Sequence, residues 1–313
     1  MLKTAKIAAD YILPLYMNGL SGRMLKAPSA NKNKKREILL VYGHHALLER
    51  WWGLVENLNQ YGNVTVPDLP GFGGMQSFKR IGISPSVDAY ADYLATFVHL
   101  RYKRKRVTII AVSYGFVVVT RMLQRYPEIA KKVDLLASIV GFMHQDDIVF
   151  NKYNQKIYKF IARVFAVRPV AFYIRYFMLN KFMLKHLYAK FPNSRRRMLE
   201  VTPDEFDESM DFEVKLWQAN DVRTHWLTTS ELLGLDNTGQ HVSLPVIHVV
   251  SEHDHYLNNV AVEQHMRQVF SGYTQFKARS RAHVPSVIAG KQAMAVLLPA
   301  GLRRLLNKNP AQN

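Results

Sequence analysis

The sequence of 313 residues contains no cysteine, which excludes disulfide bonds, thiolate metal sites and a cysteine nucleophile. It also lacks any run of about 18 uninterrupted apolar residues, the length that a membrane-spanning helix needs. Acidic residues are scarce, since 24 Asp and Glu stand against 42 Lys and Arg and leave a net charge of +18. Such a surface favours anionic partners, whether lipid headgroups, nucleic acid or acidic small molecules.

The rest of the composition is that of a globular protein, with 48% apolar and 21% charged residues, so collagen-like and disordered classes are excluded. The first twenty residues superficially resemble a signal peptide, but Asp10 and Pro14 interrupt the apolar part and no convincing cleavage site follows. We therefore expect residues 1–36 to be retained as a basic N-terminal segment that lies on the surface or at a membrane interface. Its last part, residues 26–36, is predicted to be a polar linker.

Short apolar strands alternate with helical segments, a pattern that predicts an α/β fold with a doubly wound, mostly parallel sheet. The predicted strands are residues 37–42, 63–66, 106–112, 133–140, 246–250 and 274–279. The alternation breaks between residues 142 and 241, which show helical periodicity, many aromatic residues and no convincing strand. We predict a core of residues 37–141 and 242–313, interrupted by a helical cap over residues 142–241.

A possible nucleophile lies in the stretch Ala111-Val112-Ser113-Tyr114-Gly115, between a predicted strand and a predicted helix. This is the setting of the nucleophile elbow G-x-S-x-G, in which a sharp turn lifts the serine hydroxyl above the edge of the sheet. The pentapeptide alone is a weak signal, because a serine in an ordinary strand-to-helix turn fits it equally well.

A serine nucleophile needs a base to take its proton and an anion to orient that base. In chain order, Ser113 is followed by Asp254 after the fifth predicted strand and by His283 after the sixth. All three therefore stand at the carboxyl ends of strands, where open α/β sheets place their sites. Asp146 and Asp147 follow the fourth strand and remain alternative carboxylates.

At this point the chain resembles the serine α/β-hydrolase family, and the resemblance extends beyond the three residues. It is carried by Tyr42-Gly43-His44-His45 (for His-Gly-x-Pro), Asp68-Leu69-Pro70-Gly71-Phe72-Gly73 (for D-x-P-G-x-G), Arg125-Tyr126-Pro127-Glu128 and the strand Pro245 to Asp254. The sequence departs from the family's usual residues at Tyr42, His45, Ala111, Ser251 and Ala282.

The resemblance implies the α/β-hydrolase fold and a role for each site residue. Ser113 would be the nucleophile, His283 the general base and then acid, and Asp254 the carboxylate that orients His283. The backbone N–H groups of His44 and Tyr114 would form the oxyanion hole. The expected reaction is cleavage of a small-molecule carboxylic ester with an apolar acyl group, through an acyl-serine intermediate.

Other functions stay open at this stage. The same triad would serve a peptidase, a carbon–carbon bond hydrolase, an acyltransferase or a cofactor-free haloperoxidase. Outside the enzymes, the alternative is a noncatalytic protein of the same fold that binds anionic membranes or another anionic partner.

The predicted cap suggests both a pocket and a surface. Its aromatic residues Phe165, Phe172 and Phe177, with His45, are predicted to line an apolar substrate pocket, although such rings more commonly form internal core. Between residues 152 and 197, twelve Lys and Arg alternate with eleven Phe and Tyr, and no acidic residue occurs. A helix of this kind either packs its apolar face on the core as a lid or lies on an anionic membrane surface.

No cofactor is predicted. No glycine-rich phosphate loop is present, and the paired histidines His44–His45 and His253–His255 lack the spacing of a zinc site. No nucleic-acid-binding motif accompanies the basic charge. We expect a cytoplasmic protein, either soluble or peripherally associated with a membrane.

Overall fold

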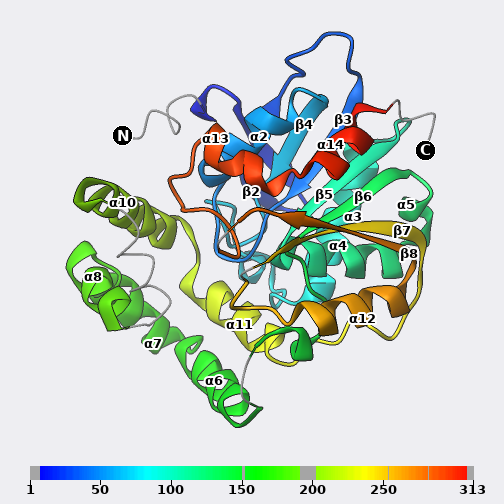
Figure 1. The fold of residues 1–313 in the computed structure, drawn as a ribbon. Helices are drawn as coiled ribbons and strands as arrows, with labels where there is room; N and C mark the ends of the chain where they lie inside the picture. Colours follow the sequence, from blue (N-terminus) through cyan, green and yellow to red (C-terminus); the bar gives the residue numbers. More distant parts are fainter. Residues whose placement is uncertain (1–7, 150–151, 191–201, 253, 281, 309–313) are drawn as a thin grey trace.

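The computed structural model describes five segments of the chain, residues 8–149, 152–190, 202–252, 254–280 and 282–308 (Figure 1). At its centre lies one eight-stranded sheet with the strand order β1-β2-β4-β3-β5-β6-β7-β8. The strands are β1 (Ile12–Met17), β2 (Leu20–Ala27), β3 (Arg36–Val41), β4 (Gly62–Pro67), β5 (Val107–Val112), β6 (Val133–Ile139), β7 (Val242–Ser251) and β8 (Phe270–Ala278). The six strands from β3 onward run parallel, whereas β1 and β2 are antiparallel to their neighbours. The prediction of a doubly wound, mostly parallel α/β sheet is confirmed.

Helices cover both faces of the sheet (Figure 1). One face carries α2 (Trp52–Leu58), α13 (Lys291–Met294) and α14 (Ala300–Asn307). The other carries α3 (Val87–Arg101), α4 (Tyr114–Arg125), α5 (Pro127–Ala130) and α12 (Asn259–Val269). Short 3₁₀ turns are η1 (Leu48–Trp51), η2 (Phe78–Ile81), η3 (Gln145–Asp147) and η5 (Ala295–Leu297). Because helices flank it on both sides, the central strand β5 is buried along its whole length.

The N-terminal segment differs from its prediction. Residues 12–27 do not lie outside the core, because they form the hairpin β1–β2, which pairs with β4. Asn18 and Gly19 make the hairpin turn with φ of 53° and 74°, and an Asn-Gly pair is the strongest short-range signal for such a turn. Leu20 and Leu25 are fully buried, which ties β2 to the core. Residues 1–7 lie outside the described residues.

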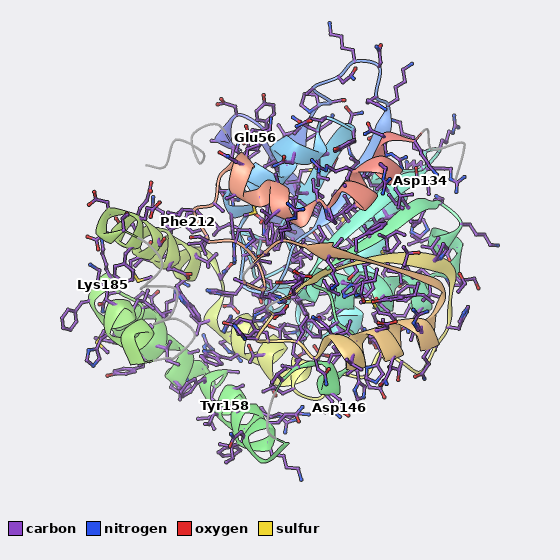
Figure 2. The ribbon with its side chains drawn as sticks, in the orientation of Figure 1. Glu56, Asp134, Asp146, Tyr158, Lys185 and Phe212 are labelled. Carbon is purple, nitrogen blue, oxygen red and sulfur yellow. The ribbon has the colours of Figure 1, made fainter. Side chains whose placement is uncertain are left out.

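The predicted polar linker also ends differently. Arg36 begins β3, and its side chain is only 2% exposed. It donates from Nη1 to Asp134 Oδ2 at 2.9 Å and to Thr108 Oγ1 at 2.6 Å. Asp134 stands at the start of β6 (Figure 2). Arg36, Thr108 and Asp134 therefore join the neighbouring strands β3, β5 and β6 at the end of the sheet opposite Ser113. The charge of Arg36, which the sequence places in a polar linker, is therefore buried and paired with Asp134.

The described residues between 142 and 241 form helices outside the sheet and contain no strand, only two isolated β-bridges. The helices are α6 (Lys152–Phe165), α7 (Arg168–Tyr173), the π-helical η4 (Ile174–Met178), α8 (Lys181–Lys190), α10 (Pro203–Ala219) and α11 (Val222–Leu232). We call this segment the helical insert. Lys181 and Lys185 of α8 pair with Asp211 and Asp207 of α10, so part of its basic charge is compensated internally. Its role as a cap over the site stays a prediction.

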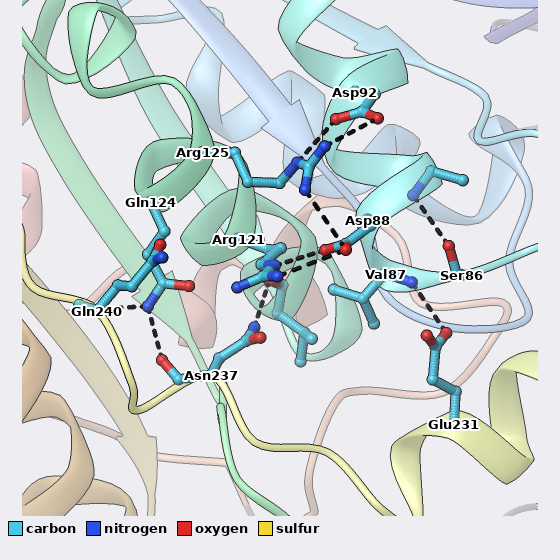
Figure 3. A network of polar contacts seen from close by, with 12 residues as sticks. Ser86, Val87, Asp88, Asp92, Arg121, Gln124, Arg125, Glu231, Asn237 and Gln240 are labelled. Atoms are coloured by element: carbon cyan, nitrogen blue, oxygen red, sulfur yellow. Dashed lines mark hydrogen bonds and ion pairs between the residues drawn. The ribbon is translucent and has the colours of Figure 1, made fainter.

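The insert is anchored to the core by a carboxylate. Glu231 of α11 accepts a hydrogen bond at 2.9 Å from the backbone N–H of Val87, at the start of α3 (Figure 3). A helix N-terminus favours a carboxylate, but burial outweighs that effect and raises the pKa of Glu231 to about 7, with Asp88 adding to the shift.

This raised pKa predicts a pH-dependent stability. The ordinary pKa of the carboxyl is 4.5, so its ionisation is less favourable in the folded state than in the unfolded one. The contribution of Glu231 is therefore fully present below pH 4.5 and is lost as the pH rises through about 7, by up to about 3 kcal/mol. Glu231→Gln keeps an acceptor for Val87 N–H and should remove this loss. Urea unfolding at pH 4.5 and pH 8 checks it; equal pH dependence in wild type and variant would contradict it.

Candidate active site

Ser113 stands on a strained turn between β5 and α4. Its φ and ψ are 50° and −120°, a left-handed conformation that non-glycine residues rarely adopt. The turn is tight because Gly115 lies against β3, where an added Cβ would clash with the carbonyl oxygen of Val41. Ala111, in the first small position of the motif, is fully buried. The sequence therefore folds locally into the elbow that its pattern predicts.

The structure brings Ser113, His283 and Asp254 together in a hydrogen-bonded chain. His283 Nε2 lies 2.9 Å from Ser113 Oγ, and His283 Nδ1 lies 2.6 Å from Asp254 Oδ2. The side chains of His283 and Asp254 are 13% and 0% exposed. An ionised carboxylate only accepts hydrogen bonds, so Asp254 holds the proton on Nδ1 and leaves Nε2 free to accept from the serine hydroxyl.

The loops that carry these side chains are tied together. Asp254 Oδ1 accepts the backbone N–H of Tyr256 at 2.9 Å. Ser251, at the end of β7, donates from Oγ to the carbonyl oxygen of Ala282 at 2.9 Å. A serine where the family usually has glycine therefore links the loop of Asp254 directly to the loop of His283.

The alternative carboxylates lie elsewhere. Asp147 is fully buried, and its Oδ1 lies 2.6 Å from Nδ1 of His265 in α12. Its other oxygen accepts the backbone N–H groups of Met143 and His144 at 2.8 and 2.9 Å. Asp147 is engaged in a second Asp–His pair that braces η3 against α12. The sequence preference for Asp254 is consistent with this geometry.

The backbone predicted to form the oxyanion hole borders Ser113. A Cβ added to Gly43 would lie 3.3 Å from Ser113 Cβ and 3.8 Å from its Oγ, so the turn that contains His44 contacts the elbow directly. Tyr114 is the first residue of α4, and the first N–H groups of a helix have no acceptor within the helix. Both predicted donors thus belong to backbone next to the nucleophile, and their catalytic role stays a prediction.

Tyr42 braces the turn that follows β4. Its hydroxyl donates to Asp68 Oδ1 at 2.8 Å and accepts the N–H of Leu69 at 2.8 Å. Arg23, from the unpredicted hairpin, donates to Asp68 Oδ2 at 3.1 Å and also pairs with Glu49. Burial raises the pKa of Asp68, and the charge of Arg23 opposes that rise. Asp68 therefore supports its own turn.

His45 ends the turn of residues 42–45, which we call the oxyanion turn because it contains a predicted oxyanion-hole donor. Its backbone conformation differs from the one that the family's usual residues would adopt. The residue has a φ of 53°, which the ring of a proline forbids because it holds φ near −65°. The family's usual proline therefore does not fit this backbone, and the departure at His45 is a structural one.

Three histidines gather beside this turn, a feature that the sequence analysis missed. Ring centroids lie 4.7 Å apart for His44 and His225 and 4.6 Å apart for His45 and His225, with Trp217 packed 4.0 Å from His45. Burial lowers the pKa of His44 to about 4 and the pKa values of His45 and His225 well below their usual range. The three rings are therefore uncharged at neutral pH, although the protein as a whole is strongly basic.

The insert holds these rings in place. His44 Nε2 lies 2.7 Å from Thr228 Oγ1 of α11, and Asn220 donates from Nδ2 to His45 Nδ1 at 3.1 Å. Asn220 Oδ1 also accepts the N–H of Gly73 at 2.7 Å. No local sequence pattern indicates this arrangement, because His225 and Asn220 are more than 170 positions from His44 and His45.

The three phenylalanines of the predicted pocket do not form one buried cluster. Phe172 and Phe177 are each 59% exposed. Phe165 packs against Trp226, at 4.9 Å between ring centroids, in a small apolar cluster within the insert. The fourth predicted pocket residue, His45, belongs to the turn that contains His44. Apolar composition alone could not show which of these side chains are exposed.

The described residues contain neither a cluster of metal-binding side chains nor a membrane-spanning helix. Among the residues that the structure describes, no three His, Cys, Asp or Glu side chains are grouped so as to hold a metal ion; His253 lies outside them. None of the helices in the described part of the chain is long and apolar enough to cross a bilayer.

A model of a protein family matches most of the chain. The model described as "alpha/beta hydrolase fold" matches residues 38–284. The chain belongs to the α/β-hydrolase fold family. The match includes Ser113, Asp254 and His283, and it runs through the helical insert.

Several solved structures resemble this α/β-hydrolase. A thermophilic esterase from Thermogutta terrifontis is 16% identical, with a TM-score of 0.64 over 95% of this chain and 98% of its own. A putative lipase from Acinetobacter baumannii is 14% identical, with a TM-score of 0.62 over 98% and 94%. MenH from S. aureus is 13% identical, with a TM-score of 0.61 over 91% and 99%. A comparison with curated protein sequences gives no match. At these identities the structural likeness shows the fold alone.

Proposed function

We propose that this protein is a serine hydrolase that cleaves carboxylic esters through an acyl-enzyme on Ser113. The observation that carries the proposal is the chain Ser113–His283–Asp254, with heavy-atom distances of 2.9 and 2.6 Å on a strained elbow. Both distances are within hydrogen-bond reach, which a nucleophile, its base and the orienting carboxylate require.

The reaction follows from these positions. As Ser113 Oγ attacks the ester carbonyl carbon, His283 Nε2 takes the hydroxyl proton, and Asp254 stabilises the imidazolium that forms. The carbonyl oxygen becomes an oxyanion beside the N–H groups of His44 and Tyr114, each donor contributing about 3–4 kcal/mol to lowering the barrier. Collapse of the intermediate breaks the ester C–O bond, and His283 returns the proton to the departing alcohol.

Deacylation repeats the sequence with water in place of the serine. His283 takes a proton from the water as it attacks the acyl carbon, and it then returns that proton to Ser113 Oγ as the acid product leaves. The surroundings support an apolar acyl group, because the histidine rings beside the turn are neutral and Trp217 packs against them. The similar structures include an esterase and a putative lipase, and both names agree with ester chemistry.

A fluorophosphonate probe tests this proposal, because it phosphonylates only a serine whose hydroxyl is activated by a base. We expect it to label the native protein on the peptide that contains Ser113, and the heat-denatured protein to remain unlabelled. A series of p-nitrophenyl esters of increasing chain length should then show turnover that favours apolar acyl groups. Adduct on another serine would contradict the assignment, and no labelling of folded protein would favour the noncatalytic alternative.

A further inference from the structure

The outer side of the helical insert is an exposed surface of apolar side chains. Most of the large apolar side chains that are exposed in the described residues lie in this one stretch. They are Ile157, Tyr158, Phe160, Val164, Val167, Phe172, Tyr173, Tyr176, Phe177 and Phe182. We call these residues the aromatic face. Soluble domains rarely leave so many large apolar side chains together in water, and a patch of this kind marks an interaction site.

The helix α6 shows that the exposure follows from the packing of the insert. It contacts α11 with its small side chains buried, Ala162 at 1% exposure and Ala166, just beyond its end, at 5%. Phe160, by contrast, is 68% exposed. Of the two arrangements that the sequence left open, burial of Phe160 against the core is not the one found in this helix.

The helices of the aromatic face lie along one side of the molecule. In Figure 1, α6, α7 and α8 follow one another at the margin farthest from the sheet. In Figure 2, the labelled Tyr158 and Lys185 lie at the two ends of this row. A partner could therefore contact the whole row without touching the sheet.

Cations interleave with these side chains. Lys156 and Arg163 lie four and three positions from Phe160 on the same side of α6, and Arg168 begins α7; all three are exposed. None of them forms an ion pair with a described residue. Three further cations of the stretch are engaged: Lys181 and Lys185 pair with carboxylates, and Arg175 donates to the carbonyl oxygen of Asn220.

We propose that the aromatic face is a docking surface for an anionic phospholipid bilayer. Aromatic and aliphatic side chains enter the boundary between headgroups and acyl chains, while neighbouring cations meet the phosphates. No acidic residue lies between positions 152 and 199, so nothing on this stretch opposes a negatively charged surface. A second copy of the chain fits less well, because the three free cations would face each other across the contact. The proposal is independent of the hydrolytic activity.

Binding to vesicles tests the proposal, and the Ser113→Ala protein is used so that no lipid is cleaved. We expect co-sedimentation with vesicles of phosphatidylcholine and phosphatidylglycerol that weakens as salt is added, and little with phosphatidylcholine alone. The variant Lys156→Gln/Arg163→Gln/Arg168→Gln should lower the partition coefficient by about 100-fold, since each cation near an anionic surface contributes about fivefold.

A control variant separates local docking from overall charge. Lys103→Gln/Arg104→Gln/Arg106→Gln removes the same charge from exposed positions just before β5, at the end of the sheet opposite Ser113. At this distance its effect should stay within about threefold in physiological salt. An equal loss in both variants, or no binding by the parent protein, would overturn the proposal.

A fluorescence measurement locates the contact itself. Phe182 is 78% exposed on α8, whereas Leu100 is 58% exposed on α3. Compared with the parent protein, which contains four tryptophans, Phe182→Trp should add emission that shifts to the blue and is quenched by brominated lipids, and Leu100→Trp should not. Light scattering without lipid measures the oligomeric state of the protein. If the protein were a dimer and the variant Phe160→Ser/Phe172→Ser were a monomer, the aromatic face would serve self-association, and the proposal would be overturned.

Discussion

We expect Ser113→Ala to lower kcat for ester hydrolysis by about 10⁴- to 10⁶-fold, the largest effect that any single substitution here should have. The substitution removes only Oγ, the atom that would form the covalent bond. His283 and Asp254 would remain, but without a nucleophile they have no proton to move. Fluorophosphonate labelling should disappear together with activity.

The fold should survive this change, which makes the result interpretable. Alanine retains the Cβ of serine, so the strain of the turn is unaltered, and we expect the free energy of unfolding to change by less than about 1 kcal/mol. Ser138→Ala is the matched control, because Ser138 is also buried near the site but bonds to His248 at 3.0 Å. It should retain labelling. Persistent labelling of the Ser113→Ala protein would show that the nucleophile lies elsewhere.

We expect Asp254→Asn to lower kcat by about 10⁴-fold. The structure specifies why an isosteric amide fails. Oδ1 accepts the backbone N–H of Tyr256, so the amide oxygen of asparagine would keep that place and its NH₂ would face His283 Nδ1. That nitrogen would then accept a hydrogen bond, and the ring proton would move to Nε2. His283 would present a donor to Ser113 and could not take its proton.

Two measurements check this explanation. The ¹⁵N chemical shifts of His283 should report the exchange of tautomers, alongside the fall in kcat. Asp147→Asn is the matched control, since Asp147 forms the same type of pair with His265 at 2.6 Å. It should cost about 1–3 kcal/mol of stability through its buried hydrogen bonds but leave the chemistry intact. If Asp147→Asn abolished turnover and Asp254→Asn did not, the orienting carboxylate would be misassigned.

Much of the core was predictable because its signals are local. Five of the six parallel strands contain short apolar runs bounded by turn residues, β8 is mostly polar, and all six are present in the sheet. The meeting of Ser113, Asp254 and His283 could be anticipated as well, since the carboxyl ends of parallel strands share one edge. Even the missed hairpin had a local signal, the Asn18-Gly19 pair at its turn.

The insert was predictable only as helices. Its periodicity indicates that apolar and basic residues recur along α6, but the same pattern suits a lid packed on the core and a surface exposed to lipid. Which of these holds depends on where the small residues Ala162 and Ala166 can approach α11 closely, and this is a matter of tertiary packing.

By itself, the sequence determined the parallel sheet, the elbow at Ser113 and the identity of its two partners, because these depend on patterns within a few residues and on the geometry common to all such sheets. Only the tertiary structure decided the tie between Asn220 and the oxyanion turn, the neutral histidines beside it and the outward aromatic face. These rest on contacts between distant segments, whose free energies depend on burial and distance rather than on neighbouring residues.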